Sequence, residues 1–491
     1  MGLKIYNTLA RQEEEFKPLS QSHVKMYVCG PTVYDMLHVG NYRGVIFFNL
    51  VRRWLEHLGH KVTYVYNYTD VDDKIIKRAN EEGKRPDEIS AQYIKEYEKD
   101  FDALKLTKHE HNPRATEYID KMVEAIKVLV DKGHAYVIDG EVFFAIGSFK
   151  GYGKLSHKKL EELQVGHRVD PDPRKKDPLD FVLWKPSKDG EPSWDSPWGR
   201  GRPGWHIECS VMVKTLLGES IDIHGGGIDL IFPHLENEIA QSEAVTGKPF
   251  VRTWMHNNFI NFGEAKMSKS LGNVVSGRAF LENYHPEILK FLILSVHYRS
   301  PLSLADTQIQ QAIAALARIY AALSVCEDML NADNVGALRE APLPNADFKK
   351  TLEEADGAFA QAMNSDFNTP AAFAKIFDVV RSFNALLPKA GKPSETLKAQ
   401  SAVLREFIVS NGELMSLFQE PPAAFLKTLD RILIKEKGLD EGMIEQRIRE
   451  RIKAREKKDF KTSDAIRDEL NGLGIDIKDG IEGTSWEVKK G

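Results

Sequence analysis

Two short segments of the chain combine residue types that bind phosphate. Residues 38–41 (HVGN) are expected between a strand and a helix, where unpaired N–H groups and the positive end of the helix dipole attract an anion. Residues 266–273 (KMSKSLGN) carry Lys266, Ser268 and Lys269 in a glycine-flanked loop, where two ammonium groups can neutralise the charge that grows as pyrophosphate leaves. The first segment alone is also typical of an ordinary helix cap. Together the two segments indicate a site for a nucleoside triphosphate.

Four residues far apart in the sequence could ligate a metal: Cys29, Cys209, His234 and Glu238. His234 and Glu238 are spaced i, i+4, so on a helix they would share one face. Two thiolates, an imidazole and a carboxylate suit Zn²⁺. Spacing alone also allows a simpler interpretation, in which the cysteines are buried core residues and the other pair faces solvent.

The elements that must position these residues follow a strand–helix–strand pattern. We expect a strand over residues 24–28, a helix from about Asn41 to Gly59, and a strand over residues 61–68. Such a βαβ unit predicts a parallel sheet. Residues 72–131 are expected to be mainly helical. Residues 171–203 are rich in Pro, Trp, Gly and Lys, which suggests an insertion wrapped over the surface rather than a core layer.

The second half of the chain changes character. Helical periodicity follows Ser303, and prolines at 421–422 precede a last small unit. There Ile444 begins an apolar stripe on a helix rich in Lys and Arg, which charge alone would make an ordinary solvated helix. The predicted fold class is α/β: a Rossmann-type parallel-sheet catalytic domain over residues 1–302 with an insertion at about 110–203. An α-helical domain (303–420) and a small α+β carboxy-terminal domain (421–491) follow.

Composition sets outer limits on function. The 491 residues are 42% hydrophobic and 28% charged with a net charge of −5, so any nucleic-acid contact must come from local basic surfaces. Three cysteines in so long a chain argue against a disulfide framework and for a reducing compartment. We expect no signal peptide and no segment long enough to span a bilayer, and therefore a cytoplasmic protein without membrane partners.

The phosphate segments resemble the signatures of class I aminoacyl-tRNA synthetases. Residues 266–270 spell that class's KMSKS motif, and residues 38–41 are similar to its HIGH motif. Residues 38–41 depart from the HIGH consensus because they end on Asn41, which can still donate to a phosphate or ribose. The resemblance implies Mg²⁺ with ATP and an aminoacyl-adenylate intermediate that is transferred to tRNA. It assigns catalysis to His38, Asn41, Lys266 and Lys269, and ATP binding to these four together with Gly40 and Ser268.

A narrower resemblance, to the cysteinyl-tRNA synthetase family, rests on several further segments. They are residues 29–35 (CGPTVYD), 67–74, 204–209, 222–230 (DIHGGGIDL), 232–238 and 366–370 (DFNTP). In that family the zinc ligands fall at Cys29, Cys209, His234 and Glu238, which implies one Zn²⁺ per chain. Leu235 departs from the family, where a second His is usual, so the residues around the ligands are expected to differ.

The same resemblance suggests how the amino acid is held. Thr69 and Asp229 would hold the amino group of cysteine, Trp205 would form a pocket wall, and His224 would support the carboxylate or thiol end. Gly30 would also line the pocket. Simpler roles exist, since Trp205 can be core and Asp229 can cap a turn. Zinc prefers thiolate to a serine hydroxyl, so we expect no editing domain.

The carboxy-terminal unit resembles the family's anticodon-binding domain, in which Trp486 would stack on a base and Arg467 would contact RNA. The expected partners are tRNA(Cys), ATP and L-cysteine, and the chain is expected to be a monomer with cysteine–tRNA ligase activity. Two alternatives stay open. One is a cysteine ligase with a small amino-sugar acceptor, and the other is a catalytically silent RNA-binding relative. Cys326 is expected to be a buried core residue.

Overall fold

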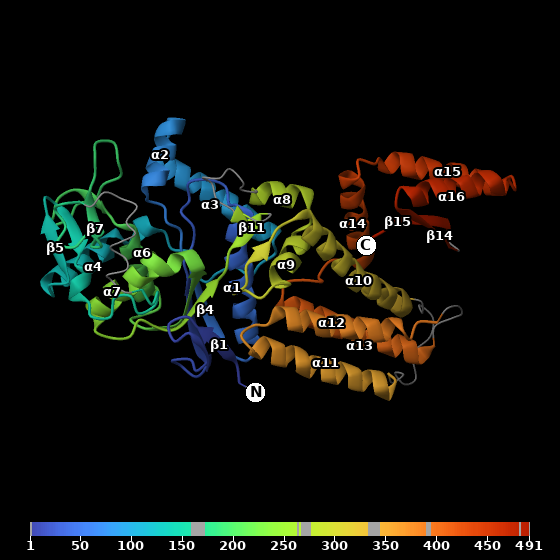
Figure 1. Cartoon of the computed structure of the whole chain (residues 1–491), viewed down its shortest axis with the longest axis horizontal. Coiled ribbons are helices and arrows are strands. Elements are labelled where there is room, and N and C mark those ends of the chain that lie inside the picture. Colours follow the sequence, from blue (N-terminus) through green and yellow to red (C-terminus); the bar gives the residue numbers. More distant parts are fainter. Residues whose placement is uncertain are drawn as a thin grey trace. The chain divides into compact units, whose positions relative to one another are not determined.

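The computed structural model describes residues 2–158, 172–262, 265–266, 276–331, 344–388, 394–480 and 483–490. The chain divides into two compact units (Figure 1). The first contains Met1–Arg278, Val296–Leu302 and Gln361–Thr369, and the second contains Ala279–Ser295, Ser303–Ala360 and Pro370–Gly491. The domain limits at 302 and 420 remain predictions, because contact-based units and functional domains need not coincide.

A four-stranded parallel sheet forms the centre of the first unit, as the βαβ pattern predicted. Its strand order is β10-β9-β3-β4. The strands are β3 (His23–Val28), β4 (Lys61–Tyr66), β9 (Ile221–Gly227) and β10 (Val251–Asn257). Val28 pairs with Tyr66 on one side and with Gly225 on the other. From β3 the chain continues to β4 on one side, whereas β9 and β10 lie on the other, so the strand order reverses between β3 and β9. Ligands of open α/β sheets bind outside the carboxyl ends of the strands at such a point.

Helices connect these strands. α1 (Val39–His57) follows β3, α6 (Trp205–Leu216) precedes β9, and α7 (Glu236–Thr246) lies between β9 and β10. The predicted helical stretch contains α2 (Asp73–Glu82), α3 (Pro86–Ala103) and α4 (Ile119–Asp131). α1 buries thirteen residues, including Val45, Phe48 and Trp54, because its apolar positions recur at helical spacing.

The insertion forms a core of its own, which corrects the expectation for residues 171–203. The strands β5 (Ala135–Ile138), β6 (Glu141–Phe144), β7 (Phe181–Pro186) and β8 (Gly201–Pro203) form an antiparallel sheet. Leu183 and Trp184 of β7 are fully buried in an apolar cluster with residues of α4 and α6. The run of four apolar residues Phe181–Trp184 overrides the Pro- and Gly-rich composition around it.

Smaller elements complete the first unit. They are the hairpin β1 (Lys4–Asn7) and β2 (Gln12–Glu15), and the short strands β11 (Ile260–Phe262), β12 (Ala265–Lys266) and β13 (Leu302–Ser303). The segment at residues 366–370 has a structural role here. Asp366 is 1% exposed, and its carboxylate accepts hydrogen bonds from Tyr6 N (2.8 Å), Tyr298 Oη (2.6 Å) and Arg299 Nε (2.7 Å).

The chain beyond Ser303 is mainly helical, as predicted, and two shorter helices precede it. The helices are α8 (Gly277–Asn283), α9 (Pro286–Leu294), α10 (Asp306–Asn331), α11 (Ala346–Asn364), α12 (Thr369–Asn384), α13 (Glu395–Leu414) and α14 (Pro422–Glu436). Among the described residues, α10 is long and apolar enough to cross a membrane, contrary to the expectation that no segment would be. Because 61% of its apolar window is buried inside the protein, its composition is that of a core helix. Cys326 is fully buried in α10.

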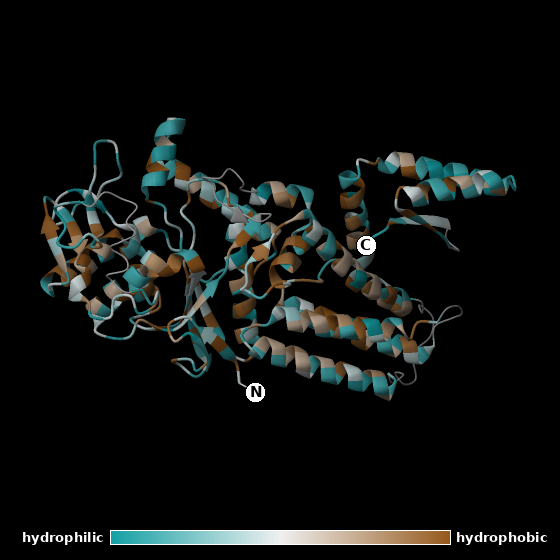
Figure 2. Ribbon diagram, viewed as in Figure 1, coloured by the Kyte–Doolittle hydropathy of each residue, from teal (hydrophilic) through white to brown (hydrophobic). Residues whose placement is uncertain are grey.

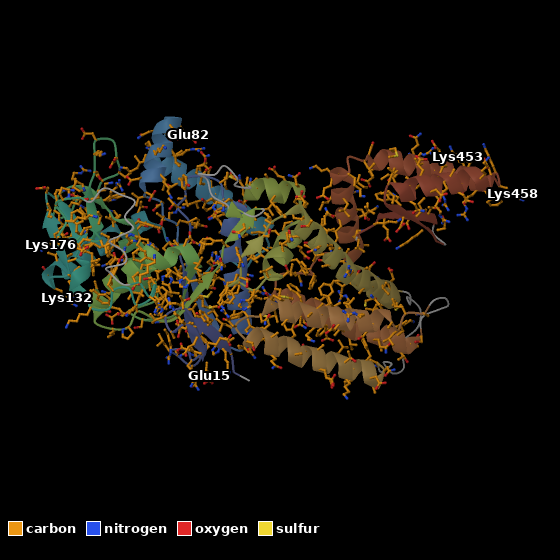
Figure 3. All side chains as sticks on the ribbon, viewed as in Figure 1. Glu15, Glu82, Lys132, Lys176, Lys453 and Lys458 are labelled. Carbon is orange, nitrogen blue, oxygen red and sulfur yellow. The ribbon has the colours of Figure 1, made fainter. Side chains whose placement is uncertain are left out.

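The last elements are α15 (Glu441–Glu456), α16 (Phe460–Gly472), β14 (Ile475–Gly480) and β15 (Gly483–Val488). The strands pair antiparallel, so the tail is α+β as expected. Ile444 and Ile448 are buried, whereas the rest of α15 is mostly hydrophilic (Figure 2). Lys453 and Lys458 are exposed cations of this unit (Figure 3).

Candidate active site with a metal centre

A cleft of about 410 Å³ lies at the carboxyl ends of β3 and β9. Several predicted site residues line it: Cys29, Gly30, His38, Gly40, Asn41, Trp205 and Asp229. The fold places them there: Cys29 comes directly after β3, and Asp229 is the second residue after β9. Trp205 begins α6 and is 39% exposed, so it forms a wall of the cleft rather than part of the core.

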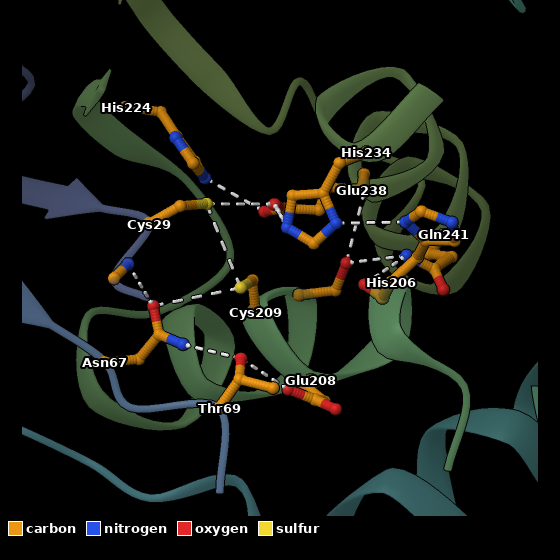
Figure 4. Close-up of polar contacts among 12 residues, drawn as sticks. Cys29, Asn67, Thr69, His206, Glu208, Cys209, His224, His234, Glu238 and Gln241 are labelled. Atoms are coloured by element: carbon orange, nitrogen blue, oxygen red, sulfur yellow. Dashed lines mark hydrogen bonds and ion pairs between the residues drawn. The ribbon is translucent and has the colours of Figure 1, made fainter. Parts of the chain in front are cut away.

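The four predicted metal ligands meet at the inner end of this cleft (Figure 4). One donor atom from each of Cys29, Cys209, His234 and Glu238 lies within 4.8 Å of the others. Cys29 Sγ is 3.9 Å from Cys209 Sγ and 3.4 Å from Glu238 Oε1, and His234 Nε2 is 3.0 Å from Glu238 Oε1.

This donor set fits a tetrahedral zinc ion. Zn–S bonds of about 2.3 Å and Zn–N or Zn–O bonds of about 2.0–2.1 Å place the ligand atoms roughly 3.3–3.8 Å apart at tetrahedral angles. The 3.9 Å separation of the sulfurs and the 3.4 Å separation of sulfur and carboxylate oxygen are close to that range, while the 3.0 Å separation of His234 Nε2 and Glu238 Oε1 is shorter. Cys209, His234 and Glu238 are buried, while Cys29 is half-buried at the edge of the cleft. The side open to a ligand is therefore that of Cys29.

Without a metal, protons on the side chains of this cluster balance its negative charges. The pKa of Cys209 is lowered to about 6, mainly by its hydrogen bond with Cys29, while burial raises the pKa of Cys29. Burial alone would lower the pKa of His234, but hydrogen bonds with Cys209 and Glu238 raise it to about 10. Burial would likewise raise the pKa of Glu238, yet His224 and His234 lower it to about 2. Such groups release protons when a divalent cation binds.

His224 lies behind the ligands rather than in the cleft. It is fully buried, and its Nε2 is 2.9 Å from Glu238 Oε2. Its ring also stacks on Trp254 at a centroid distance of 4.7 Å. The residue is thus placed to orient the Glu238 carboxylate, and the expected contact with the substrate carboxylate or thiol would have to pass through Glu238.

The floor of the cleft is fixed by polar contacts between the ends of β3 and β4. Gly30 N donates to Asn67 Oδ1 at 2.9 Å, and a Cβ on Gly30 would lie 1.7 Å from the Asn67 carbonyl oxygen. Only glycine allows this approach. Thr69 is 2% exposed, and its hydroxyl donates to Glu208 Oε2 at 3.0 Å. Burial, followed by the nearby Cys209, raises the pKa of Glu208 well above its ordinary value.

The other side of the cleft contains the start of α1. His38 is the N-cap residue with extended backbone, and its N–H donates to Asn41 Oδ1 at 3.0 Å. A Cβ on Gly40 would lie 2.9 Å from His38 Nδ1, so glycine leaves room for the His38 ring. The positive end of the α1 dipole lies at this end of the cleft, as anion binding requires, while the Asn41 N–H is bonded to the His38 carbonyl at 2.9 Å. The backbone of Lys266 lies in β12, and Ser268 and Lys269 fall outside the described residues.

Comparison with known proteins gives this arrangement a family. The family described as tRNA synthetases class I (C) catalytic domain matches residues 15–314, DALR domain matches residues 358–419, and Cysteinyl-tRNA ligase anticodon binding domain matches residues 443–486. A cysteine–tRNA ligase of Bdellovibrio bacteriovorus is 51% identical over 488 residues, which cover 99% of this chain and 100% of that protein. The chain belongs to the cysteine–tRNA ligase family.

Further relatives agree with this membership of the cysteine–tRNA ligase family. The cysteine–tRNA ligase of Syntrophotalea carbinolica is 46% identical, with full coverage of both chains. Among solved structures, a methionyl-tRNA synthetase of Mycobacterium tuberculosis in complex with methionyl-adenylate aligns with a TM-score of 0.59 over 86% of this chain and 95% of that one. Its sequence is 15% identical, so the likeness is one of fold. The predictions of a class I fold and of this family are confirmed.

Sequence reasoning missed three polar residues of the site. Lys74, at the start of α2, lines the cleft, and its Nζ is 5.4 Å from the centroid of the Tyr34 ring. It lies within the motif at residues 67–74, whose charge was a usable signal. Glu208 is fully buried beside Cys209, and His206 Nδ1 is 2.9 Å from His234 Nδ1. Their roles depend on tertiary contacts that spacing does not show.

The predicted RNA contacts lie in the second unit. Arg467 in α16 is partly exposed and has an ion pair with Asp479 at 3.4 Å, where Arg451 and Arg455 also converge. Trp486 lies in β15 opposite Ile477 and is partly buried. Of the three guanidinium groups at Asp479, that of Arg451 is buried, whereas those of Arg455 and Arg467 are accessible to solvent.

Proposed function

We propose that this chain activates L-cysteine with ATP, forms cysteinyl-adenylate, and transfers the cysteinyl group to tRNA(Cys) with release of AMP and pyrophosphate. The carrying observation is the convergence of Cys29, Cys209, His234 and Glu238 at a cleft whose other side contains the amino end of α1. A site that prefers thiols thus adjoins a site that prefers phosphate.

We assign Cys29, Cys209, His234 and Glu238 as ligands of one Zn²⁺. When bound, zinc supplies a soft Lewis acid that accepts the cysteine thiolate and discriminates against the serine hydroxyl. This explains how near-isosteres are separated without a second hydrolytic site, since pocket shape alone distinguishes them poorly. The partly exposed Cys29 marks the side from which the substrate thiol enters.

The rest of the amino acid is held by neighbouring groups. Trp205 stacks on His234 at a centroid distance of 4.2 Å and limits the width of the pocket. Asp229 is exposed on the opposite wall, where its carboxylate attracts the substrate ammonium. Thr69 lies in the floor of the cleft, where its hydroxyl contacts Glu208. Gly30 has no side chain that would fill the space beside Asn67.

Activation is an in-line displacement at the α-phosphorus of Mg²⁺-bound ATP. A carboxylate oxygen of cysteine forms a bond to phosphorus while the bond to the bridging oxygen breaks, and pyrophosphate leaves with that electron pair. His38, Asn41 and the positive end of the α1 dipole stabilise phosphate charge at the start of α1. Lys266, Ser268 and Lys269 are assigned to the β- and γ-phosphates by their motif. No side-chain nucleophile is required, because positioning and electrostatics lower the barrier.

In the second step the 2′-hydroxyl of the terminal adenosine of tRNA attacks the cysteinyl carbonyl. The new ester bond forms as the bond to AMP breaks, and the hydroxyl proton is released. We assign tRNA contacts to Arg467 and Trp486 in the carboxy-terminal unit, because the side chains of both residues are partly exposed there. We further propose that the enzyme is a cytoplasmic monomer without an editing domain.

Charging of a tRNA(Cys) transcript with radiolabelled cysteine tests the function. We expect ATP-dependent formation of an acid-precipitable ester, and much less with a transcript whose anticodon is changed. Absence of charging by protein that does form the adenylate would contradict the tRNA assignment and favour a small acceptor, of which an amino-sugar is the chemical class to try.

A further inference from the structure

His234 makes different contacts with its two ring nitrogens. Its Nε2 is 3.0 Å from Glu238 Oε1 on the side of the metal cluster, and its Nδ1 is 2.9 Å from Nδ1 of His206 on the other side (Figure 4). His234 is 1% exposed, so neither contact is replaced easily by water. Two imidazole nitrogens can share a hydrogen bond only when one carries the proton and the other presents a lone pair.

The direction of that bond follows from the metal assignment. A histidine that ligates a metal through Nε2 keeps its proton on Nδ1 and donates it to a partner. We propose that His206 is that partner: a positioning residue whose Nδ1 accepts the Nδ1 proton of His234 and thereby fixes the tautomer and ring plane that present Nε2 to zinc. This inference rests on the proposed zinc-dependent function.

His206 is itself held from several elements. Its backbone carbonyl accepts a hydrogen bond from Gln241 Nε2 of α7 at 2.8 Å. Its ring lies 5.5 Å from Phe181 of β7 in an edge-on arrangement of 84°, and 5.1 Å from Trp205. The ring of His206 therefore has little freedom to turn, which an acceptor of fixed direction requires.

The neighbour of His234 in the chain offers no alternative acceptor. Leu235 is fully buried, belongs to the apolar cluster that contains Met212 and Ile239, and has no polar side-chain atom. The acceptor accordingly comes from α6, which also contains the ligand Cys209. One helix thus supplies both a metal ligand and the residue that orients another ligand.

Two substitutions separate the hydrogen bond from the packing. H206F keeps a flat ring between Phe181 and Trp205 but removes the acceptor. H206N places an oxygen, Oδ1, directly on Cγ, as the imidazole Nδ1 is, so the acceptor is kept without the ring. H206L replaces H206F should the larger ring fail to fit. Zinc-free melting curves establish that each variant folds.

The readout is the rate at which zinc passes from the protein to a coloured chelator, together with the visible spectrum of the cobalt-substituted form. We expect H206F to release zinc about 10–100-fold faster than wild type with an altered cobalt spectrum, and H206N to stay within about threefold of wild type. Release by H206F at the wild-type rate, or release by H206N as fast as by H206F, would overturn the inference alone. Folded wild-type protein that retains no zinc would overturn the metal assignment and the inference together.

Discussion

Cys29 and Cys209 are 180 residues apart in the chain, yet their sulfur atoms are 3.9 Å apart. The first follows a central strand and the second lies in the helix before the next strand of the sheet. As thiolates, the two sulfurs would be unfavourable beside a buried carboxylate without a cation, because each negative charge raises the cost of the next. A bound metal therefore explains the closeness of the two sulfur atoms better than a role in packing does.

Replacing Cys29 by alanine tests that assignment. We expect the variant to lose stoichiometric zinc and to activate cysteine more than about 100-fold more slowly. This loss is larger than the roughly 10–100-fold loss expected when a residue that only contacts a metal ligand is replaced. Metal content by mass spectrometry and pyrophosphate exchange measure the two effects. C326A is the matched control, because Cys326 is fully buried in α10 and should affect stability alone. A C29A protein that keeps one zinc per chain would contradict the assignment.

A methyl group at Gly30 should disturb the floor of the cleft. The added Cβ would lie 1.7 Å from the Asn67 carbonyl, so the ends of β3 and β4 must separate. We expect G30A to lower the free energy of unfolding by about 1–3 kcal/mol and to reduce cysteine activation, as overpacking does elsewhere. The control is G147A, since a Cβ on Gly147 meets nothing within 4 Å. Urea unfolding of both variants checks this, and equal stability would show that the contact is not rigid.

Removal of the His38 side chain should affect the chemical step most. His38 caps α1 where we assign the phosphates, so H38A is expected to lower kcat for activation about 10²–10³-fold. The KM for cysteine should change little, because the metal cluster and Trp205 hold the other end of the substrate. Steady-state exchange kinetics with ATP and cysteine varied separately distinguish these effects. A variant with raised KM for ATP and unchanged kcat would assign His38 to ground-state binding instead.

The RNA assignment predicts a separation of the two half-reactions. Trp486 lies in the carboxy-terminal unit, so W486A is expected to raise the KM for tRNA while cysteine-dependent pyrophosphate exchange stays at the wild-type rate. Loss of one stacked base costs about 1–3 kcal/mol, which is about a 5–150-fold change in KM. Unchanged charging kinetics would mean that Trp486 only stabilises the β14–β15 hairpin.

The stability of the first unit should fall in weak acid because of His109. Burial, followed by the positive charge of Arg52, lowers the pKa of His109 to about 4. Its ring stacks on Tyr66 at a centroid distance of 4.9 Å. In the unfolded chain its pKa is about 6.5, so between the two values the unfolded state binds the extra proton. The contribution of His109 to the free energy of unfolding is therefore fully present above about pH 6.5 and is lost as the pH falls toward 4.

The variant H109F removes this titration while keeping a ring beside Tyr66. Urea unfolding gives the free energy of unfolding at pH 7.5 and at pH 4.5. Between these two values the wild type should lose as much as about 3 kcal/mol more of this free energy than the variant. Parallel losses in the two proteins would mean that His109 is accessible to protons in the folded state.

The sequence predicted the central sheet because apolar residues recur at helix and strand spacing on both sides of residues 38–41. The β7 strand was missed because its aromatic residues lie among Pro and Gly, which usually indicate loops. The hairpin at the start of the chain was also missed, since Gln12–Glu15 has almost no apolar residue. β7 forms a strand because it packs into an apolar cluster, whereas the mostly exposed β2 forms a strand because it pairs with β1.

The site was harder to predict than the fold. His38 and Asn41 were identifiable because they are adjacent in the chain at a strand–helix junction. Without the family resemblance, Cys29 and Cys209 would have remained candidate core residues, because nothing local connects positions so far apart. His224 was assigned to the substrate, whereas its position on Glu238 depends on strand register, and the contact of His206 with His234 depends on how α6 meets the turn before α7.

Pyrophosphate exchange with cysteine and with serine in parallel, on protein of known zinc content, tests the central claim most directly. We expect rapid exchange with cysteine, almost none with serine, and loss of the cysteine reaction when zinc is removed. Equal exchange with serine, or no exchange from folded, zinc-loaded protein, would contradict the account.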